Sequence, residues 1–264
     1  MQTTTIHPTA VIHPDACLGT GVTVGPYAII EENVRIGDGT IIDAGAQIKR
    51  FTTLGTQNHV HSMACVGGEP QDLKFHGEET RLQIGDRNKI REFSTIHRGT
   101  EGGGGMTQVG SDNLMMAYSH IAHDCVIGDN NVLANAATLA GHVIVGNEVV
   151  VGGLSAVHQF VNIGDFAFIG GKTGVAQDVP PFMLAVGERA TLRGLNLIGL
   201  RRHGFSSDEI HALKSAYKLI WRSNQERNEV IQQVETELGN FPQVMKLLDF
   251  IRSSKRGTIS PERI

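Results

Sequence analysis

An aliphatic residue recurs at every sixth position through most of the chain. The rhythm runs from residue 6 to residue 66, returns over residues 84–96, and returns again over residues 109–175. Each of these six-residue units begins with Ile, Leu, Val or Met, glycine often follows directly, and the fifth position is usually Ala, Ser, Thr, Val or Asn. The pattern therefore indicates a narrow interior from which large side chains are excluded.

A six-residue repeat of this kind is typical of a parallel β-helix, in which each unit forms a short strand and a corner. Three units close one triangular coil of about eighteen residues, so about nine coils are expected. We predict a mainly β fold with this β-helix over residues 1–190. Two loops interrupt it, at about 67–83 and 101–108.

The repeat stops after the segment QDVPP, and from about Thr191 the pattern becomes helical. We predict a C-terminal α-helical domain over residues 191–264. Ser206 and Glu209 have the spacing of a capping box ahead of apolar residues at helical intervals. Further helices are expected at about 228–238 and 242–251, and the last residues, SSKRGTISPERI, are expected to be frayed.

The coil period places residues eighteen apart in one column, with a rise of about 4.8 Å between them. His123, Gly141 and Gln159 then share a column, and the next column holds Asp124, His142 and Phe160. When both loops are bypassed, His97 lies on the same face, and both loops leave the prism there. His120 ends the preceding unit and is assigned to the preceding face.

This arrangement favours acyl transfer, in which a histidine removes a proton from an attacking hydroxyl or amine. Imidazole suits this role because its pKa lies near neutral pH. His123 is the candidate base, because the next coil presents Gly141, whose bare backbone N–H can meet an oxyanion. No covalent intermediate and no metal or other cofactor is needed.

Two other readings of the same residues stay open at this point. A zinc hydrolyase would use His120, His123 and His142 as metal ligands, since three histidines are a known catalytic zinc set. A non-catalytic assembly platform would have no defined cleft, and its histidines would be solvated surface residues.

Charge and composition restrict the partners. The net charge is −4 with no basic run, which gives no reason to expect nucleic acid or stable membrane insertion. No signal peptide or long apolar stretch is recognisable, so a cytoplasmic protein is expected. Residues 189–222 nevertheless carry seven Lys or Arg against Asp208 and Glu209. This segment is a candidate docking surface for an acidic partner or for phosphates.

Several short motifs together resemble the UDP-N-acetylglucosamine 3-O-acyltransferase family: GEPQDLKF, IGDRNKIRE, TIHRGT, SHIAHDC, ANAATLAGHV, VHQF, GVAQDVPP and RRHGFS. The resemblance covers nearly the whole chain and implies a left-handed β-helix in a homotrimer, with active sites between neighbours. It implies transfer of a (3R)-hydroxyacyl chain from acyl carrier protein to the 3-hydroxyl of UDP-N-acetylglucosamine, the first step of lipid A biosynthesis. Another nucleotide sugar, or a 3-amino acceptor, is the alternative.

The resemblance also implies roles for individual residues. His123 is the base, Asp124 orients it, and Gly141 is the oxyanion donor. Adjacent strand residues normally point to opposite faces, so the His123–Asp124 pair requires a corner. The implied substrate contacts are Asp72, Lys74, His97, His120, His142, Gln159, Gly171, Asn196 and Arg202.

Three positions affect the implied specificity. Glycine at 171 leaves the acyl groove open, which predicts a longer hydroxyacyl chain. Asn196 and Arg202 match the nucleotide contacts, because an arginine presents a fork of donors to phosphate. Ile198 and His203 depart from the family pattern, in which an acid and a second basic residue are common, so the nucleotide contacts differ there.

Overall fold

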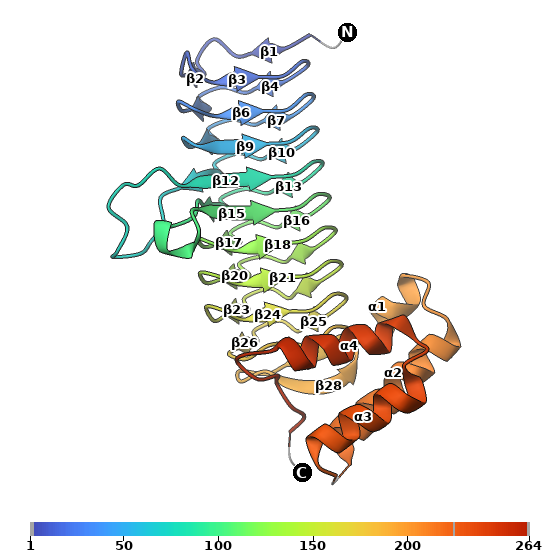
Figure 1. Ribbon diagram of the computed structural model, residues 1–264. Helices are drawn as coiled ribbons and strands as arrows, with labels where there is room; N and C mark the ends of the chain where they lie inside the picture. Colours follow the sequence, from blue (N-terminus) through green and yellow to red (C-terminus); the bar gives the residue numbers. More distant parts are fainter. Residues whose placement is uncertain (1–2, 224, 263–264) are drawn as a thin grey trace.

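A computed structural model describes residues 3–223 and 225–262. The chain winds into a three-sided prism of stacked coils, with α-helices gathered at its C-terminal end (Figure 1). Each coil contributes one short strand to each of three parallel sheets, here called sheets A, B and C. Strands pair in register eighteen residues apart, as Thr5 pairs with Thr23, and the two loops lengthen that interval where they occur.

Sheet A has 11 strands, in the order β1 (Thr5–Ile6), β4 (Thr23–Val24), β7 (Ile41–Ile42), β10 (His59–Val60), β13 (Lys89–Ile90), β16 (Leu114–Met115), β19 (Val132–Leu133), β22 (Val150–Val151), β25 (Phe168–Ile169), β27 (Met183–Val186) and β28 (Thr191–Leu195). Sheet B has 9, in the order β2 (Val11–Ile12), β5 (Ile29–Ile30), β8 (Gln47–Ile48), β11 (Cys65–Gly68), β14 (Thr95–His97), β17 (His120–Ile121), β20 (Thr138–Leu139), β23 (Ala156–Val157) and β26 (Gly174–Val175). Sheet C has 8, from β3 (Cys17–Leu18) through β6 (Arg35–Ile36), β9 (Thr52–Leu54), β12 (Arg81–Ile84), β15 (Met106–Val109), β18 (Val126–Ile127) and β21 (Ile144–Val145) to β24 (Asn162–Ile163).

Two positions of each six-residue unit supply the side chains of the interior. The aliphatic first position and the small fifth position of each unit point inward, as Val24 and Val22 do, and both are almost fully buried. Glycine after the aliphatic residue allows successive coils to touch. A Cβ on Gly37 would lie 2.5 Å from the backbone of Gly55, so no larger residue fits there.

Buried asparagines connect the coils inside the prism. Asn58, Asn88, Asn113 and Asn131 occupy the fifth position in successive coils, and each is at most 1% exposed. The side-chain oxygen of Asn88 accepts from both the backbone and the side chain of Asn113, at 3.0 Å each, while its amide donates to Asn58. These bonds satisfy polar groups that would otherwise be buried without partners.

Both loops leave the prism after strands of sheet B and return to sheet C, on one side of the molecule (Figure 1). The first occupies residues 69–80, because β11 extends to Gly68 and β12 begins at Arg81. The second occupies residues 98–105 and contains a short 3-10 helix, η1 (Glu101–Gly103). The expectation that the loops share the histidine face of the prism is therefore confirmed.

The C-terminal region begins with a strand. Thr191–Leu195, expected to be helical, forms β28 and pairs antiparallel with β27. The predicted start of the helices at residue 191 is wrong, because Leu192 and Leu195 pack against the end of the prism, where both are buried. The helices are α1 (Leu197–Arg202), α2 (Ser207–Arg222), α3 (Arg227–Leu238) and α4 (Pro242–Ser253). None of the described helices is long and apolar enough to cross a membrane.

Two other expectations for this region have different outcomes. The capping box of α2 is confirmed, since Ser206 and Glu209 exchange side-chain and backbone hydrogen bonds. The tail is not frayed over residues 254–262. Its Ile259 N–H donates to the carbonyl of Asp178 and Leu192 donates to Ser260, because Thr258 and Ile259 are buried against the end of the prism. Residues 263–264 lie outside the described part.

We expect Asn88→Ala to lower the free energy of unfolding by about 1–3 kcal/mol, because it leaves the buried backbone N–H of Asn113 without its acceptor and removes the amide donor to Asn58. Chemical denaturation measures the change. Asn240→Ala is the matched control: Asn240 is exposed, and we expect a change within about 0.5 kcal/mol. Equal stability of the two variants would contradict a stabilising role for the asparagine ladder.

Candidate active site

His123 and Asp124 form the corner between β17 of sheet B and β18 of sheet C. Asp124 has a φ of +58°, a left-handed conformation that aspartate tolerates better than most residues. This corner removes the alternation of an extended strand, so both side chains leave the prism on the same side. The Nδ1 of His123 lies 2.7 Å from an Asp124 carboxylate oxygen, and the expected pairing at a corner is thus present.

The second loop holds the carboxylate of Asp124. Thr100 donates to it twice, through its backbone N–H at 2.8 Å and its hydroxyl at 2.6 Å. The backbone N–H of Asp124 donates to the hydroxyl of Thr107 at 2.7 Å. Gly103 packs so closely that a Cβ there would lie 2.1 Å from the Asp124 carboxyl carbon. The Asp124 side chain is only 1% exposed, so loop and corner form one unit.

Sequence reasoning identified none of Thr100, Gly103 and Thr107. The glycine run EGGGG was a usable signal, because consecutive glycines mark places where backbone approaches another group closely. The six-residue repeat alone marks it only as an interruption.

His123 lies directly against Gly141 of the next coil. A Cβ on Gly141 would be 2.6 Å from Cε1 and 2.8 Å from Nε2 of the imidazole, so only glycine allows the ring to lie there. The backbone N–H of Gly141 makes no hydrogen bond within the described part of the chain. Because Asp124 is a carboxylate, Nδ1 of His123 carries the donated proton, and Nε2 presents its lone pair beside the unpaired N–H.

Three further histidines surround this corner and are held neutral. Burial, with help from the neighbouring His120, lowers the pKa of His97 to about 4. Burial also lowers the pKa of His120 and, against the opposing charges of Asp124 and Asp72, that of His142. Neutral imidazoles both donate and accept, which suits the hydroxyl groups of a sugar. The Nδ1 of His97 is buried with no partner among the described residues.

His120 lies on sheet B itself. The six-residue frame predicts the preceding face for it, but it forms strand β17 with Ile121 and so points into the same cleft. Its Nδ1 is 2.7 Å from the hydroxyl of Thr95, and its ring meets His97 edge-on at 4.8 Å. The six-residue unit begins at Ile121, whereas the strand begins one residue earlier, at His120.

The three-histidine zinc set of His120, His123 and His142 is not assembled. In this cleft the described donor atoms that lie within 4.8 Å of one another belong to His123, Asp124 and His142 instead. The carboxylate in that group already binds Thr100 and His123. His142 stacks on Phe160 with ring centroids 4.4 Å apart and meets His123 edge-on at 5.2 Å.

The first loop is fastened over the cleft by Arg98, which was absent from the sequence-based set of site residues. Its guanidinium is buried, donates to Glu69 at 3.1 Å and lies 5.2 Å from the ring of Phe75. Asp72 accepts from the backbone N–H of Lys74 at 3.0 Å, which shapes the tip of the loop. The side chain of Lys74 is exposed.

The remaining expected site residues lie along three edges of the prism. Gln159 is exposed in the column of His123 and Gly141. Gly171 is exposed at the corner between sheets A and B, where a Cβ would meet only the carbonyl of Gly153 at 3.4 Å. Asn196 caps α1 and donates to the carbonyl of Phe166, at the corner between sheets C and A. Arg202 is exposed at the end of α1, so one chain does not bring Gly171, Asn196 and Arg202 together with His123.

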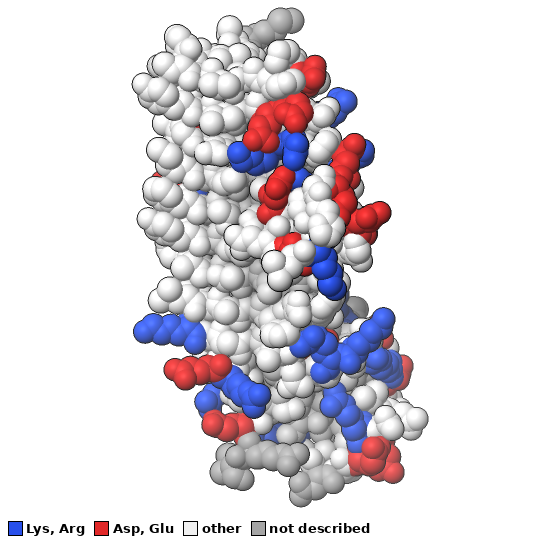
Figure 2. Space-filling model, turned by 90° about the vertical axis from the view of Figure 1, so that its left-hand side faces the viewer, with Lys and Arg blue, Asp and Glu red and all other residues white. Residues whose placement is uncertain are grey.

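Basic side chains gather near the helices. A groove of about 350 Å³ is lined by Arg193, Lys214, Tyr217, Lys218 and Arg222, among others. Figure 2 shows the loop-bearing side of the molecule, where Lys and Arg side chains collect toward the helical end. His203, which departs from the family pattern, lies 3.6 Å from Glu148, whereas Ile198 is 66% exposed.

Comparison with known proteins agrees with this architecture. Residues 178–259 match the family model "Udp N-acetylglucosamine O-acyltransferase; Domain 2", and residues 106–141 match the bacterial transferase hexapeptide model. A protein of Thermodesulfovibrio yellowstonii, named acyl-[acyl-carrier-protein]--UDP-N-acetylglucosamine O-acyltransferase, is 48% identical over 252 residues, which are 96% of this chain and 98% of that protein. The chain belongs to the UDP-N-acetylglucosamine O-acyltransferase family.

Solved structures of the UDP-N-acetylglucosamine O-acyltransferase family superpose closely. LpxA from Acinetobacter baumannii is 42% identical with a TM-score of 0.94, and the relative from Moraxella catarrhalis is 44% identical with a TM-score of 0.93. Each match covers 96% of this chain and 99% of the other. The left-handed β-helix is thereby confirmed, and an acyltransferase is favoured over a zinc hydrolyase or a non-catalytic platform.

The buried His97 predicts a loss of stability in acid. Below pH 6.5 the unfolded chain takes up a proton at this residue and the folded protein does not, so the free energy of unfolding falls as pH falls toward 4. At pH 5 this amounts to about 2 kcal/mol. We expect His97→Gln to lose less stability than the parent protein between pH 7 and pH 5 in denaturant titrations.

His13→Gln is the control for this measurement, because His13 is an exposed histidine far along the prism. It should keep the acid sensitivity of the parent protein. If His97→Gln lost as much stability between pH 7 and pH 5 as the parent protein, burial of the His97 imidazole would not be the cause of the acid sensitivity.

Proposed function

We propose that this protein transfers a (3R)-hydroxyacyl chain from acyl carrier protein to the 3-hydroxyl of UDP-N-acetylglucosamine, the first step of lipid A biosynthesis, in the cytoplasm. The single observation that carries the chemistry is the position of His123. One ring nitrogen binds Asp124, while Nε2 lies beside Gly141, whose backbone N–H has no hydrogen-bond partner among the described residues. The curated relative that is 48% identical supports the donor and acceptor, because its name contains both.

The reaction follows from this geometry in two steps. Nε2 of His123 takes the proton of the sugar hydroxyl while that oxygen attacks the thioester carbonyl. Asp124 stabilises the imidazolium, and the Gly141 N–H donates to the oxyanion. As the tetrahedral intermediate collapses, the C–S bond breaks and the sulfur takes the proton from His123. The products are an ester and a free thiol, without an acyl-enzyme.

The neutral histidines suit the sugar. His97, His120 and His142 line the approach to His123, and their lowered pKa values keep them uncharged at neutral pH. Asp72 and Lys74 approach the same cleft from the first loop, where Asp72 is close enough to affect the pKa of His142. We assign these five residues, with Gln159, to contacts with the sugar and the acyl chain.

A homotrimer accounts for the residues that one chain leaves apart. Gly171, Asn196 and Arg202 lie near the other two edges of the prism, so they reach the cleft of His123 only from a neighbouring subunit. Parallel packing of three prisms brings different edges of neighbours together. Asn196 and Arg202 then contact the nucleotide, and Gly171 leaves the groove open for a longer hydroxyacyl chain. The basic groove at α2 suits the acidic acyl carrier protein.

The direct test is to incubate the purified protein with UDP-N-acetylglucosamine and a panel of hydroxyacyl carrier proteins, and to follow acyl transfer by mass spectrometry. We expect one donor of the panel to give an ester on the sugar. Folded protein that forms no product with any donor would contradict the proposed function.

His123→Ala tests the base. We expect kcat to fall by about 10²–10⁴, the usual contribution of a positioned base, while assembly and folding persist. Stopped assays with the preferred donor measure the rate, and light scattering measures the assembly. Gln47→Ala, on a strand of sheet B before both loops, is the matched control and should keep the parent rate. Undiminished turnover in His123→Ala would exclude the mechanism.

Thr100→Val tests the positioning of Asp124. The substitution removes the hydroxyl donor at 2.6 Å while keeping the backbone donor. A hydrogen bond to a charged group is worth about 1.5–3 kcal/mol, so kcat should fall at least about tenfold. The KM for the sugar nucleotide should change little, and Thr100→Ser should restore most of the rate. A rise in KM at constant kcat would indicate a substrate contact instead.

A further inference from the structure

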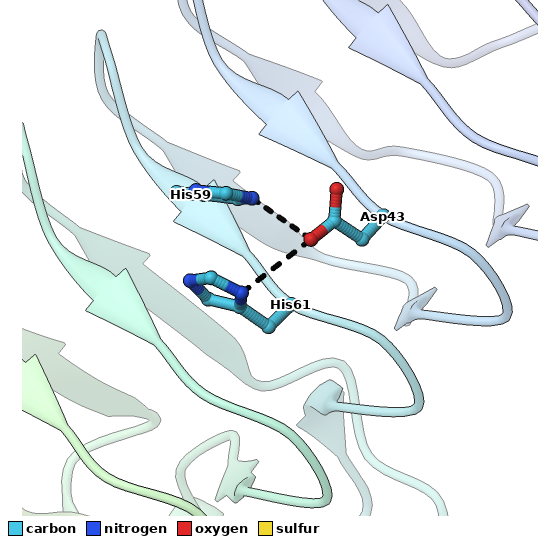
Figure 3. A group of neighbouring side chains, drawn as sticks. All are labelled: Asp43, His59 and His61. Carbon is cyan, nitrogen blue, oxygen red and sulfur yellow. Dashed lines mark hydrogen bonds and ion pairs between the residues drawn. The ribbon is translucent and has the colours of Figure 1, made fainter.

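A second cluster of imidazole and carboxylate side chains lies on sheet A, on a different side of the prism from His123. Asp43 follows β7, and His59 and His61 flank the buried Val60 on β10 (Figure 3). Strand alternation turns both imidazoles outward, and the register sets His61 beside Asp43 of the preceding coil. Among the described residues, only this group and that of His123 have three such donor atoms within 4.8 Å of one another.

The three donors converge on one point. His59 Nε2 lies 2.8 Å and His61 Nδ1 lies 3.5 Å from the same oxygen of Asp43. Figure 3 shows both rings turned toward this carboxylate, His59 from β10 and His61 from the residue directly after that strand. Ligand atoms at about 2.0–2.2 Å from a tetrahedral zinc are about 3.3 Å apart, so the two spacings of 2.8 and 3.5 Å need only small adjustments, and the third pair of donor atoms lies within 4.8 Å.

We propose that Asp43, His59 and His61 bind a divalent transition-metal ion of the zinc class. Two imidazoles and one carboxylate form a donor set that Zn²⁺, Co²⁺ and Ni²⁺ accept and that Mg²⁺ and Ca²⁺ disfavour. The side chains are between 19% and 34% exposed, which leaves the fourth position open to water. The ion connects two coils of sheet A and is separate from the acyl-transfer chemistry.

The surroundings limit the affinity. Lys89 and Arg91 occupy the same two columns on the next coil. Arg91 is paired with Glu92 at 2.8 Å, which offsets its charge, but Lys89 adds a positive charge near the site. With one carboxylate and one nearby lysine, the ion binds more weakly than in a closed four-ligand site. The strand pairs on both sides, with β7 and β13, so the ligands need little rearrangement.

Titration calorimetry of the full-length protein with Zn²⁺, and absorption spectra with Co²⁺, test this proposal. We expect one equivalent per chain that depends on these residues, a visible Co²⁺ spectrum of tetrahedral intensity, and a rise of several degrees in the unfolding midpoint at saturating Zn²⁺. His59→Gln, His61→Gln and Asp43→Asn should each weaken this binding at least tenfold. Each should keep the parent rate of acyl transfer.

Two controls separate this site from others. His13→Gln removes an exposed histidine that lies 3.6 Å from Asp15 without a second imidazole in the pair. This variant should still bind one equivalent of Zn²⁺. His142→Gln removes a donor of the His123 cluster and should also still bind one equivalent of Zn²⁺. Absence of Zn²⁺ binding by the parent protein, or equal binding by His59→Gln and the parent protein, would overturn the proposal. If a β10 variant fails to fold, the same comparison is made with Asp43→Asn on the preceding coil.

Discussion

Backbone hydrogen bonds between successive coils are the constraint on which the structure depends. Each strand residue pairs in register with the residue one coil away, so the chain cannot shift a side chain without breaking the ladder. The narrow interior is filled by small and aliphatic residues, and by glycine where coils touch. The site of His123 inherits this rigidity, because its base and its oxyanion donor belong to adjacent rungs of one ladder.

The periodic part of the fold was predictable from the sequence for this reason. The column of His123, Gly141 and Gln159 and the stacking of His142 on Phe160 follow from the coil length, and the structure confirms both. The cluster of Asp43 and His61 was equally accessible, since these residues are also one coil apart. The sequence analysis does not predict it, because it lies on sheet A, whereas both loops leave sheet B and mark that side as the cleft.

The aperiodic parts were not predictable in the same way. Thr100 reaches Asp124 from a loop whose path no repeat specifies, and Arg98 folds back under the other loop. His120 was assigned to the wrong face because unit boundaries counted from the aliphatic residue differ by one from strand boundaries. Strand β28 and the paired tail depend on apolar contacts with the end of the prism, which local helical spacing does not encode.

The direct stacking of His123 on Gly141 has a consequence for how such a chain varies. A substitution on an outer surface leaves both residues where they are, whereas inserting or deleting one residue between them would turn the later coils by part of a side and bring a different residue over the imidazole. This stretch therefore tolerates substitutions of outward-facing side chains but does not tolerate a change in its length. Loops inserted outside the interval, such as the two beside the cleft, escape that restriction because they rejoin the ladder in phase.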